Sequence, residues 1–298
     1  MAPTNPDTTK VEMDFVREHI DDRTVALVGS AGNYPYGTID PISELSDLAV
    51  EHGIGLHVDA CLGGFILPFG ESLGYEIPAF DFRLPGVTSI SADTHKYGYG
   101  LKGTSVVLYR DASFRKYQYF ISPTWKGGIY ASNGLAGSRS GGLIAATWAA
   151  MVRYGRHGYE HYAKEIFETA FRMQRSVKDA GLSIMGDPTF CFSFRSDDFD
   201  IYHVNDFMKT RGWRFNGQQN PASIHMCVTR PQTQPGVAEA FEGDLQEAVV
   251  YANEHRSEKP LSSAIYGGGA TGGLSLDSPE AIEQLMIFAL DTLQAYPF

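Results

Sequence analysis

The stretch SADTHKYGYGLKG, residues 91–103, places a lysine directly after a histidine, among glycines and tyrosines. A lysine on a solvated surface needs no such surroundings, and the glycines make the stretch a poor helix. Its first residues complete the run VTSISAD, residues 87–93, which is typical of a buried strand. The sequence therefore predicts that Lys96 lies at the end of a strand, where a fixed lysine can have a chemical task.

The segments around this stretch alternate between strand and helix patterns. A helix is expected over residues 12–20, and apolar runs predict strands over residues 24–30, 55–60 and 103–110. Between the first two strands, PISELSDLAVEHG has a helical apolar stripe with proline in its first turn and glycine at its end. This order predicts a three-layer α/β domain with parallel strands.

The second half of the chain has a different pattern of predicted elements. A Gly/Ser-rich loop, residues 125–142, leads into a long helix over residues 143–181, which we expect to break near Gly155 or Gly158. Further strands are expected over residues 189–196 and 223–230, and helices over residues 201–212, 236–255 and 278–296. We therefore expect a large domain over residues 1–150 and a small C-terminal α/β domain over residues 151–298.

Composition limits the classes of function. The 298 residues carry a net charge of −11 and contain no polybasic run, which argues against binding to nucleic acid. No apolar run of 18 residues predicts a transmembrane segment, and MAPTNPDTTK lacks the apolar core of a signal peptide. Cys61, Cys191 and Cys227 lack metal-type spacing and predict no disulfide framework. These features predict a cytoplasmic protein in a reducing compartment.

Two other kinds of site are weakly supported. VGSAGNYPYG lacks the spacing of a dinucleotide-binding loop, and YGGGATGG, residues 266–273, has no βαβ context and is expected to be a surface loop. His57 and Asp59 share one face of a strand and could bind a metal with His95, but no H-E-x-x-H or C-x-x-C pattern supports this. A buried polar pair is the alternative interpretation of His57 and Asp59.

The combination of Asp59 and Lys96 indicates a more specific chemistry. Asp59 ends one predicted strand, and Lys96, 37 positions later, follows another. Pyridoxal 5'-phosphate enzymes need a lysine that forms a Schiff base with the cofactor. They also need a carboxylate that keeps the pyridine nitrogen protonated. The two residues therefore predict a pyridoxal 5'-phosphate site.

Three segments together resemble a known family. GLHVDACLGGF, SISADTHKYGYGLKGTSVVLYR and WKGGIYASNGLAGSRSGG are similar to the sphingosine-1-phosphate lyase family, one of the fold-type I pyridoxal phosphate enzymes near the group II amino-acid decarboxylases. The resemblance runs from near residue 5 to at least residue 180. It implies a transferase-like α/β fold and a homodimer with shared active sites. It also implies cleavage of a phosphorylated sphingoid base to a fatty aldehyde and phosphoethanolamine.

The resemblance also implies roles around the cofactor. Lys96 matches the Schiff-base lysine, and Asp59 matches the partner of the pyridine nitrogen. Cys61 matches a small residue that packs against the ring, and His95 matches a histidine near the cofactor phosphate. The alternative interpretations are that Lys96 is a solvated surface lysine, that Cys61 is a core cysteine and that His95 is a buried histidine with satisfied hydrogen bonds.

Further residues match other parts of the family's site, and Ser30 and Ser138 are expected to bind the cofactor. Tyr34 and Lys102 match residues that serve the substrate phosphate and the cleavage step. Ser30 is expected at the carboxyl edge of the sheet, where ligands bind in open α/β folds. Ser138 and Arg139 lie in a glycine-rich loop that in the family reaches the neighbouring subunit's site.

Two alternatives stay open, one from a departure from the family and one from the neighbouring decarboxylases. Met1 matches a position inside the family's cofactor domain, after the glycine-rich loop that holds the cofactor phosphate and after the histidine that stacks on the ring. The resemblance therefore implies a partial cofactor domain, and a non-catalytic remnant is one alternative. A related amino-acid decarboxylase is the other, although Lys102 favours a phosphorylated substrate.

Overall fold

The computed structural model describes residues 1–263 and 279–295. Their contacts form two compact units. The first unit comprises Met1–Arg172, Met185–Phe192 and Cys227–Ala238, and the second comprises the remaining segments. The boundary expected at residue 150 stays a prediction.

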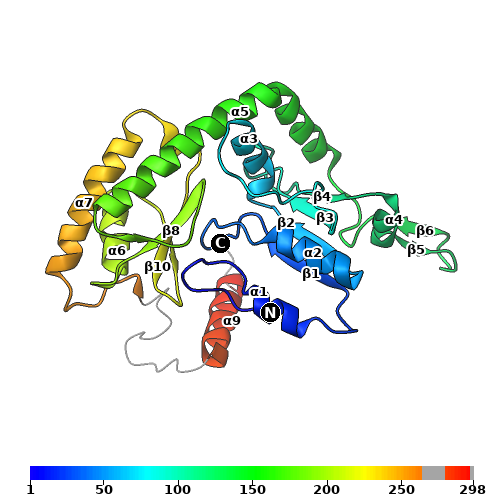
Figure 1. Cartoon of the computed structure of the whole chain (residues 1–298), viewed down its shortest axis with the longest axis horizontal. Helices are drawn as coiled ribbons and strands as arrows, with labels where there is room; N and C mark the ends of the chain where they lie inside the picture. Colours follow the sequence, from blue (N-terminus) through cyan, green and yellow to red (C-terminus); the bar gives the residue numbers. More distant parts are fainter. Residues whose placement is uncertain (264–278, 296–298) are drawn as a thin grey trace. The chain divides into compact units, whose positions relative to one another are not determined.

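The first unit is built on a four-stranded sheet of order β1-β2-β3-β4 (Figure 1). The first three strands are parallel, as the alternation of strand and helix patterns predicts, and β4 is antiparallel to β3. The strands are β1 (Ala26–Ser30), β2 (Gly55–Asp59), β3 (Val87–Ala92) and β4 (Val106–Tyr109). The helices before β4 are α1 (Met13–His19), α2 (Ile42–His52), α3 (Leu67–Ser72) and the 3-10 turn η1 (Gly63–Phe65).

Helix α2 covers one face of β1 and β2 (Figure 1). Its apolar stripe buries Ile42 and Leu45, as the spacing predicts. A Cβ added at Gly29 of β1 would lie 2.6 Å from the Cδ1 atom of Ile42, so glycine permits the close approach of helix and strand. Gly53 ends the helix at φ 64°, and its N–H donates to the carbonyls of Ala49 and Val50.

Short elements between β4 and the long helix were not predicted. They are α4 (Ala112–Arg115), η2 (Lys116–Gln118) and an antiparallel hairpin of β5 (Phe120–Ser122) and β6 (Tyr130–Ser132). The expectation of a continuous loop over residues 125–142 is therefore wrong at β6. Strands of three residues are too short to show alternation, which explains the miss.

Helix α5 (Gly141–Asp179) has the expected break. Gly155 has φ 56° and ψ −177°, a conformation essentially restricted to glycine, whereas Gly158 stays helical. Of the two glycines offered by the sequence, Gly155 therefore interrupts the helix.

The second unit contains most of a sheet of order β7-β8-β10-β9, with its helices. The remaining elements are β7 (Ser183–Ile184), β8 (Cys191–Arg195), α6 (Tyr202–Thr210), β9 (Asn216–Gln218), β10 (Ser223–Cys227), η3 (Arg230–Thr233), α7 (Val237–Glu254) and α9 (Pro279–Ala295). The indole of Trp213 ties the end of α6 to α7 by donating to Asp244 at 2.8 Å. The predicted loop YGGGATGG lies outside the described residues. Among those described, no helix combines the length and apolarity needed to cross a bilayer.

Candidate active site

A row of polar side chains crosses the carboxyl end of the parallel strands. Leu56 and Val58 of β2 are buried, and the residues that alternate with them, His57 and Asp59, are only half-buried. The strand register pairs Asp59 with Ser30 of β1 and with Ser91 of β3. Since alternate strand residues share a face, the sheet presents a carboxylate, an imidazole and hydroxyls on one side.

Asp59 is held as an ionised carboxylate. Its Oδ1 accepts hydrogen bonds from the Cys61 N–H at 3.0 Å and the Ser91 hydroxyl at 3.2 Å, and the Cys61 thiol also bonds to the carboxylate. Burial raises the pKa of Asp59, but these hydrogen bonds outweigh it, and the pKa is lowered overall. A carboxylate accepts about four hydrogen bonds, so a further donor can be accommodated beside these three.

His57 is held between two hydroxyls. Its Nδ1 lies 2.8 Å from the Ser89 hydroxyl and its Nε2 lies 3.2 Å from that of Ser91. Burial lowers the pKa of His57, although the Asp59 carboxylate acts in the opposite direction. The neutral imidazole therefore positions Ser91, which bonds to Asp59. Because the imidazole is uncharged, it does not neutralise the negative charge of Asp59.

Lys96 follows β3, as predicted, and its amine has two neighbours. Nζ lies 3.0 Å from Oδ2 of Asp93 and 3.4 Å from Sγ of Cys61. Burial lowers the pKa of the ammonium, but the contacts with Asp93 and Cys61 outweigh it and raise the pKa overall. Because Cys61 also bonds to Asp59, a short chain of contacts joins Lys96 to Asp59.

Asp93 was not among the predicted site residues. Burial raises its pKa, but hydrogen bonds from Ser105, at 2.5 Å, and from Lys96 outweigh it, so the pKa is lowered. Its position three residues before Lys96 was the available signal. Spacing alone did not show that the chain turns back after β3 to bring the two side chains together.

The turn that carries Lys96 is held by its neighbours. A Cβ added at Gly98 would lie 2.5 Å from the carbonyl oxygen of Thr94, so the tight turn requires glycine. The Tyr159 hydroxyl donates to the Gly98 carbonyl at 2.8 Å, and the buried Tyr97 hydroxyl donates to the Val228 carbonyl at 2.8 Å. These contacts hold the two residues that directly follow the lysine.

His95 points into the same turn. Its Nδ1 lies 2.5 Å from the Thr104 carbonyl oxygen, which makes Nδ1 the protonated nitrogen. Its Nε2 lies 3.9 Å from the Asp93 carboxylate. The structure thus places His95, Lys96, Cys61 and Asp59 in one neighbourhood.

The other predicted residues have different surroundings. The Ser30 N–H donates to Asp40 at 2.8 Å, and Ser30 joins the site through its pairing with Asp59. Tyr34 is 53% exposed. Lys102 is exposed, and it forms no hydrogen bond or ion pair with any residue that the structure describes. The predicted roles of these residues stay predictions.

Ser138 lines a separate pocket of about 590 Å³. Ser105 lines the same pocket, and its hydroxyl bonds to Asp93, the partner of Lys96. The pocket's hydroxyl groups come from Thr94, Thr104, Ser105, Ser138, Ser140 and Thr147. Ser138 thus lines the same pocket as Ser105, and its predicted role at the cofactor stays a prediction.

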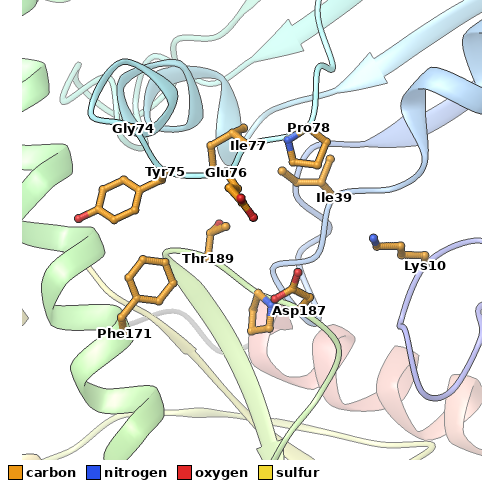
Figure 2. A pocket seen from close by; sticks show the side chains of 11 residues that line it. Lys10, Ile39, Gly74, Tyr75, Glu76, Ile77, Pro78, Phe171, Asp187 and Thr189 are labelled. Carbon is orange, nitrogen blue, oxygen red and sulfur yellow. The ribbon is translucent and has the colours of Figure 1, made fainter.

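A second pocket, of about 720 Å³, contains none of the predicted residues. Figure 2 shows Lys10 and Asp187 towards one side of it and Tyr75 and Phe171 towards the other. Although it is the larger of the two, it has neither the amine nor the carboxylate of the Asp59–Lys96 chain. The chemistry of the side chains therefore identifies the sheet edge as the candidate active site.

The residues at this edge fit pyridoxal 5'-phosphate. Lys96 offers a half-exposed amine, and Asp59 offers an ionised carboxylate with room for another donor. Cys61 lies between them. This donor set matches the needs of the cofactor's aldehyde and of its ring nitrogen.

Comparisons with known proteins agree with this arrangement. The model of the pyridoxal-dependent decarboxylase conserved domain matches residues 10–188. The chain is 45% identical to the sphingosine-1-phosphate lyase of Dictyostelium discoideum over 88% of its own length and 50% of the relative's. It is 46% identical to sphingosine-1-phosphate lyase 1 of Rattus norvegicus over 87% of its length and 46% of the relative's. The chain thus spans about half the length of these curated relatives.

Solved structures show the same fold. The sphingosine-1-phosphate lyase of Burkholderia pseudomallei is 66% identical, with a TM-score of 0.83, over 86% of this chain and 59% of that one. The glutamate decarboxylase of Lactobacillus brevis is 25% identical, with a TM-score of 0.72, over 85% and 61% of the two chains. These findings confirm the α/β fold of the fold-type I enzymes and the resemblance to sphingosine-1-phosphate lyases. The chain belongs to the pyridoxal-dependent decarboxylase family.

Proposed function

We propose that this chain carries the lysine-bearing part of a pyridoxal 5'-phosphate-dependent carbon–carbon lyase. The substrate is a phosphorylated long-chain base, and the products are a fatty aldehyde and phosphoethanolamine. The observation that carries the proposal is the contact chain Lys96–Cys61–Asp59 at the carboxyl edge of the sheet. The identity of 45% to 66% to sphingosine-1-phosphate lyases supports the choice of substrate.

The bound cofactor would supply an electron sink for the pair released when the carbon–carbon bond breaks. Lys96 would hold it covalently, and Asp59 would accept a hydrogen bond from its ring nitrogen. Asp93 keeps the Lys96 amine oriented and, by raising its pKa, favours the protonated form before the cofactor arrives. Lys102 and Tyr34 are our candidates for holding the substrate phosphate and for moving the hydroxyl proton.

The proposal is tested first by locating the cofactor. We expect the purified protein, supplied with pyridoxal 5'-phosphate, to turn yellow, and borohydride to fix the cofactor to Lys96. Peptide mass spectrometry identifies the modified lysine, and Lys96→Ala should abolish the signal. Lys126→Ala, in the exposed loop before β6, is the control. Trapping on another lysine would show that the site is misplaced.

The second test concerns the reaction. Assays for a fatty aldehyde and for carbon dioxide are run on one preparation that binds the cofactor. Aldehyde release from a phosphorylated long-chain base supports the lyase. Carbon dioxide release from an amino acid, without aldehyde release, would indicate a decarboxylase, the activity named for the Lactobacillus relative.

We also infer that the active assembly is a homodimer. Its support is the group of apolar side chains, each at least 37% exposed, on β4, the β5–β6 hairpin and the first turns of α5: Val106, Val107, Leu108, Phe120, Ile121, Ile144, Trp148 and Val152. Exposed apolar area of this kind marks a protein-binding surface. Light scattering after gel filtration should give twice the chain mass, and a monomer at micromolar concentration would contradict the inference.

A further inference from the structure

Two cysteines stand opposite each other on neighbouring strands. Cys191 begins β8 and Cys227 ends β10, and these strands are adjacent in their sheet. The Val228 N–H donates to the Phe190 carbonyl at 3.3 Å. These residues directly precede Cys191 and follow Cys227, and the side chains of the two cysteines are themselves in contact. Residue numbers in the two pairs rise along β8 as they fall along β10, as in an antiparallel ladder, so Cys191 and Cys227 are the next pair after Phe190 and Val228.

This register suits a covalent bond between the two sulfur atoms. Hydrogen-bonded and non-hydrogen-bonded pairs alternate along an antiparallel ladder, so the pair next to Phe190 and Val228 is of the non-hydrogen-bonded kind. The Cα atoms of such pairs lie about 4.5 Å apart, which is within the range found in disulfides. The backbone therefore needs little movement to accept a disulfide.

The side chains are already in contact. A hydrogen bond joins the two thiols, with Cys191 fully buried and Cys227 half-buried. The Tyr97 hydroxyl lies 3.1 Å from the Cys227 sulfur. The third cysteine, Cys61, has its contacts at Lys96 and Asp59. The fold thus selects one pair of thiols out of three.

We propose that Cys191 and Cys227 form a reversible cross-strand disulfide on mild oxidation by hydrogen peroxide. The oxidant meets the half-buried Cys227 first and is reduced to one water as the sulfur becomes a sulfenic acid. The Cys191 sulfur then attacks, the S–S bond forms, and a second water leaves. In total, both S–H bonds and the O–O bond break, and two electrons pass from sulfur to oxygen. A dithiol reverses the bond by exchange.

The environment sets the pace of this reaction. The hydrogen bond to Cys227 and burial both raise the pKa of the Cys191 thiol, so little thiolate is present at neutral pH. Thiolate is the nucleophile, and oxidation is therefore slower than at an exposed, activated cysteine. We therefore expect the bond to form slowly under peroxide and to be reversed by a dithiol.

The test uses the 298-residue chain, treated with hydrogen peroxide and then alkylated before digestion with trypsin. Cys191 lies between Lys178 and Arg195, and Cys227 lies after Arg214, so the two fall on separate peptides. We expect a linked pair of these peptides that disappears with dithiothreitol. The oxidised chain should also unfold at a higher temperature, by roughly 5 °C or more, because the bond restricts the unfolded chain.

Three variants make the test specific. Cys191→Ser and Cys227→Ser should each lose the linked peptides and the rise in unfolding temperature, whereas Cys61→Ser should keep both. A disulfide that includes Cys61, or a linked pair that forms only after unfolding in urea, would overturn the proposal. The peroxide treatment is first shown to oxidise a reference dithiol. If Cys191 and Cys227 are still fully alkylated after the same treatment, the proposal is overturned as well.

Discussion

At the scale of single residues, Asp93 controls the state of the Lys96 amine. Its carboxylate lies 3.0 Å from Nζ and helps to raise the pKa of the ammonium. Only the neutral amine attacks an aldehyde, so Asp93→Asn should lower the pH at which the cofactor attaches. The attachment is measured by absorbance at a series of pH values.

Asp81→Asn is the matched control for this change. Asp81 is a carboxylate paired with Arg83, and it has no contact with the lysine turn. Its substitution should leave the pH profile of attachment unchanged. A profile that is the same in Asp93→Asn and in the parent would show that Asp93 does not govern the amine.

Asp59 makes a prediction about rate. A carboxylate that bonds to the cofactor's ring nitrogen stabilises the charge that develops in the transition state. Asp59→Asn in a preparation that turns over should therefore lose roughly a thousandfold in kcat, several kcal/mol of stabilisation. Steady-state kinetics measure the loss in kcat, and circular dichroism shows whether the variant is folded. If Asp59→Asn turned over like the parent, Asp59 would not stabilise the transition state.

Asp59 also makes a prediction about acid stability. Its pKa is lowered in the fold by its hydrogen bonds, although burial opposes them. Such a group stabilises the fold above its unfolded pKa, and the contribution is lost as pH falls through the folded pKa. The free energy of unfolding of Asp59→Asn, from urea titrations, should therefore vary less with pH in the acid range than that of the parent. Equal slopes would contradict this.

Lys102 makes a prediction about specificity. Its ammonium is exposed and has no carboxylate partner among residues 1–263 and 279–295, so it can bind a phosphate. A charge-assisted contact of this kind contributes about 1.5–3 kcal/mol. Lys102→Met should lower kcat/KM for the phosphorylated base by the factor that corresponds to this free energy. The kcat/KM for the unphosphorylated base should not change. Equal losses for both would indicate a folding defect.

The sequence predicted some residues of this site for a physical reason. Asp59 and Lys96 each follow an apolar run, and parallel strands end at one edge of a sheet, so their proximity follows from the order of elements. Asp93 and Ser105 could not be predicted in this way. Their contact depends on how the chain turns between β3 and the antiparallel β4, which no periodicity records.

At the scale of elements, Gly155 gives a clean test of backbone strain. A Cβ added at Gly155 or at Gly243 would meet no atom within 4 Å, so packing does not distinguish the two. Gly155 breaks α5 at φ 56°, whereas Gly243 is an ordinary residue of α7. Gly155→Ala should therefore destabilise the fold by about 1–3 kcal/mol. Gly243→Ala should stabilise it by up to about 1 kcal/mol. Urea unfolding measures both, and effects of the same sign would refute the comparison.

The longer helices were predicted more closely than several of the shortest elements. The helices α2 and α7 have enough turns to show an apolar stripe, and their bounds agree closely with the sequence patterns. Hairpin β5–β6 has three residues in each strand, and α3 has six residues. In such short pieces, tertiary contacts rather than local periodicity decide the conformation, so the sequence alone did not reveal them.

At the scale of the whole molecule, the extent of the chain bears on activity. It spans about half the length of its curated relatives. We expect the 298-residue chain alone to bind pyridoxal 5'-phosphate weakly and to release little aldehyde. A longer chain, or a mixture with a separate polypeptide that covers the part of the relatives not matched by this chain, should bind more tightly.

Fluorescence titration with the cofactor and an aldehyde assay check this expectation. The control is Lys96→Ala in the longer chain, which should remove turnover while leaving association intact. Turnover by the 298-residue chain at the rate of the longer one would contradict the prediction, because its own residues would then suffice.

Cys61 gives the site a built-in chemical reporter. Its sulfur lies 3.4 Å from the Lys96 amine, and burial and the Asp59 carboxylate raise the pKa of the thiol more than Lys96 lowers it. A small alkylating reagent would label it slowly, at a pace set by how open the surroundings of the amine are. Any molecule that settles there would shield the sulfur, whether or not it reacts. The labelling rate therefore measures occupancy independently of colour or turnover, and it would let inhibitors be ranked on a chain that has no activity at all.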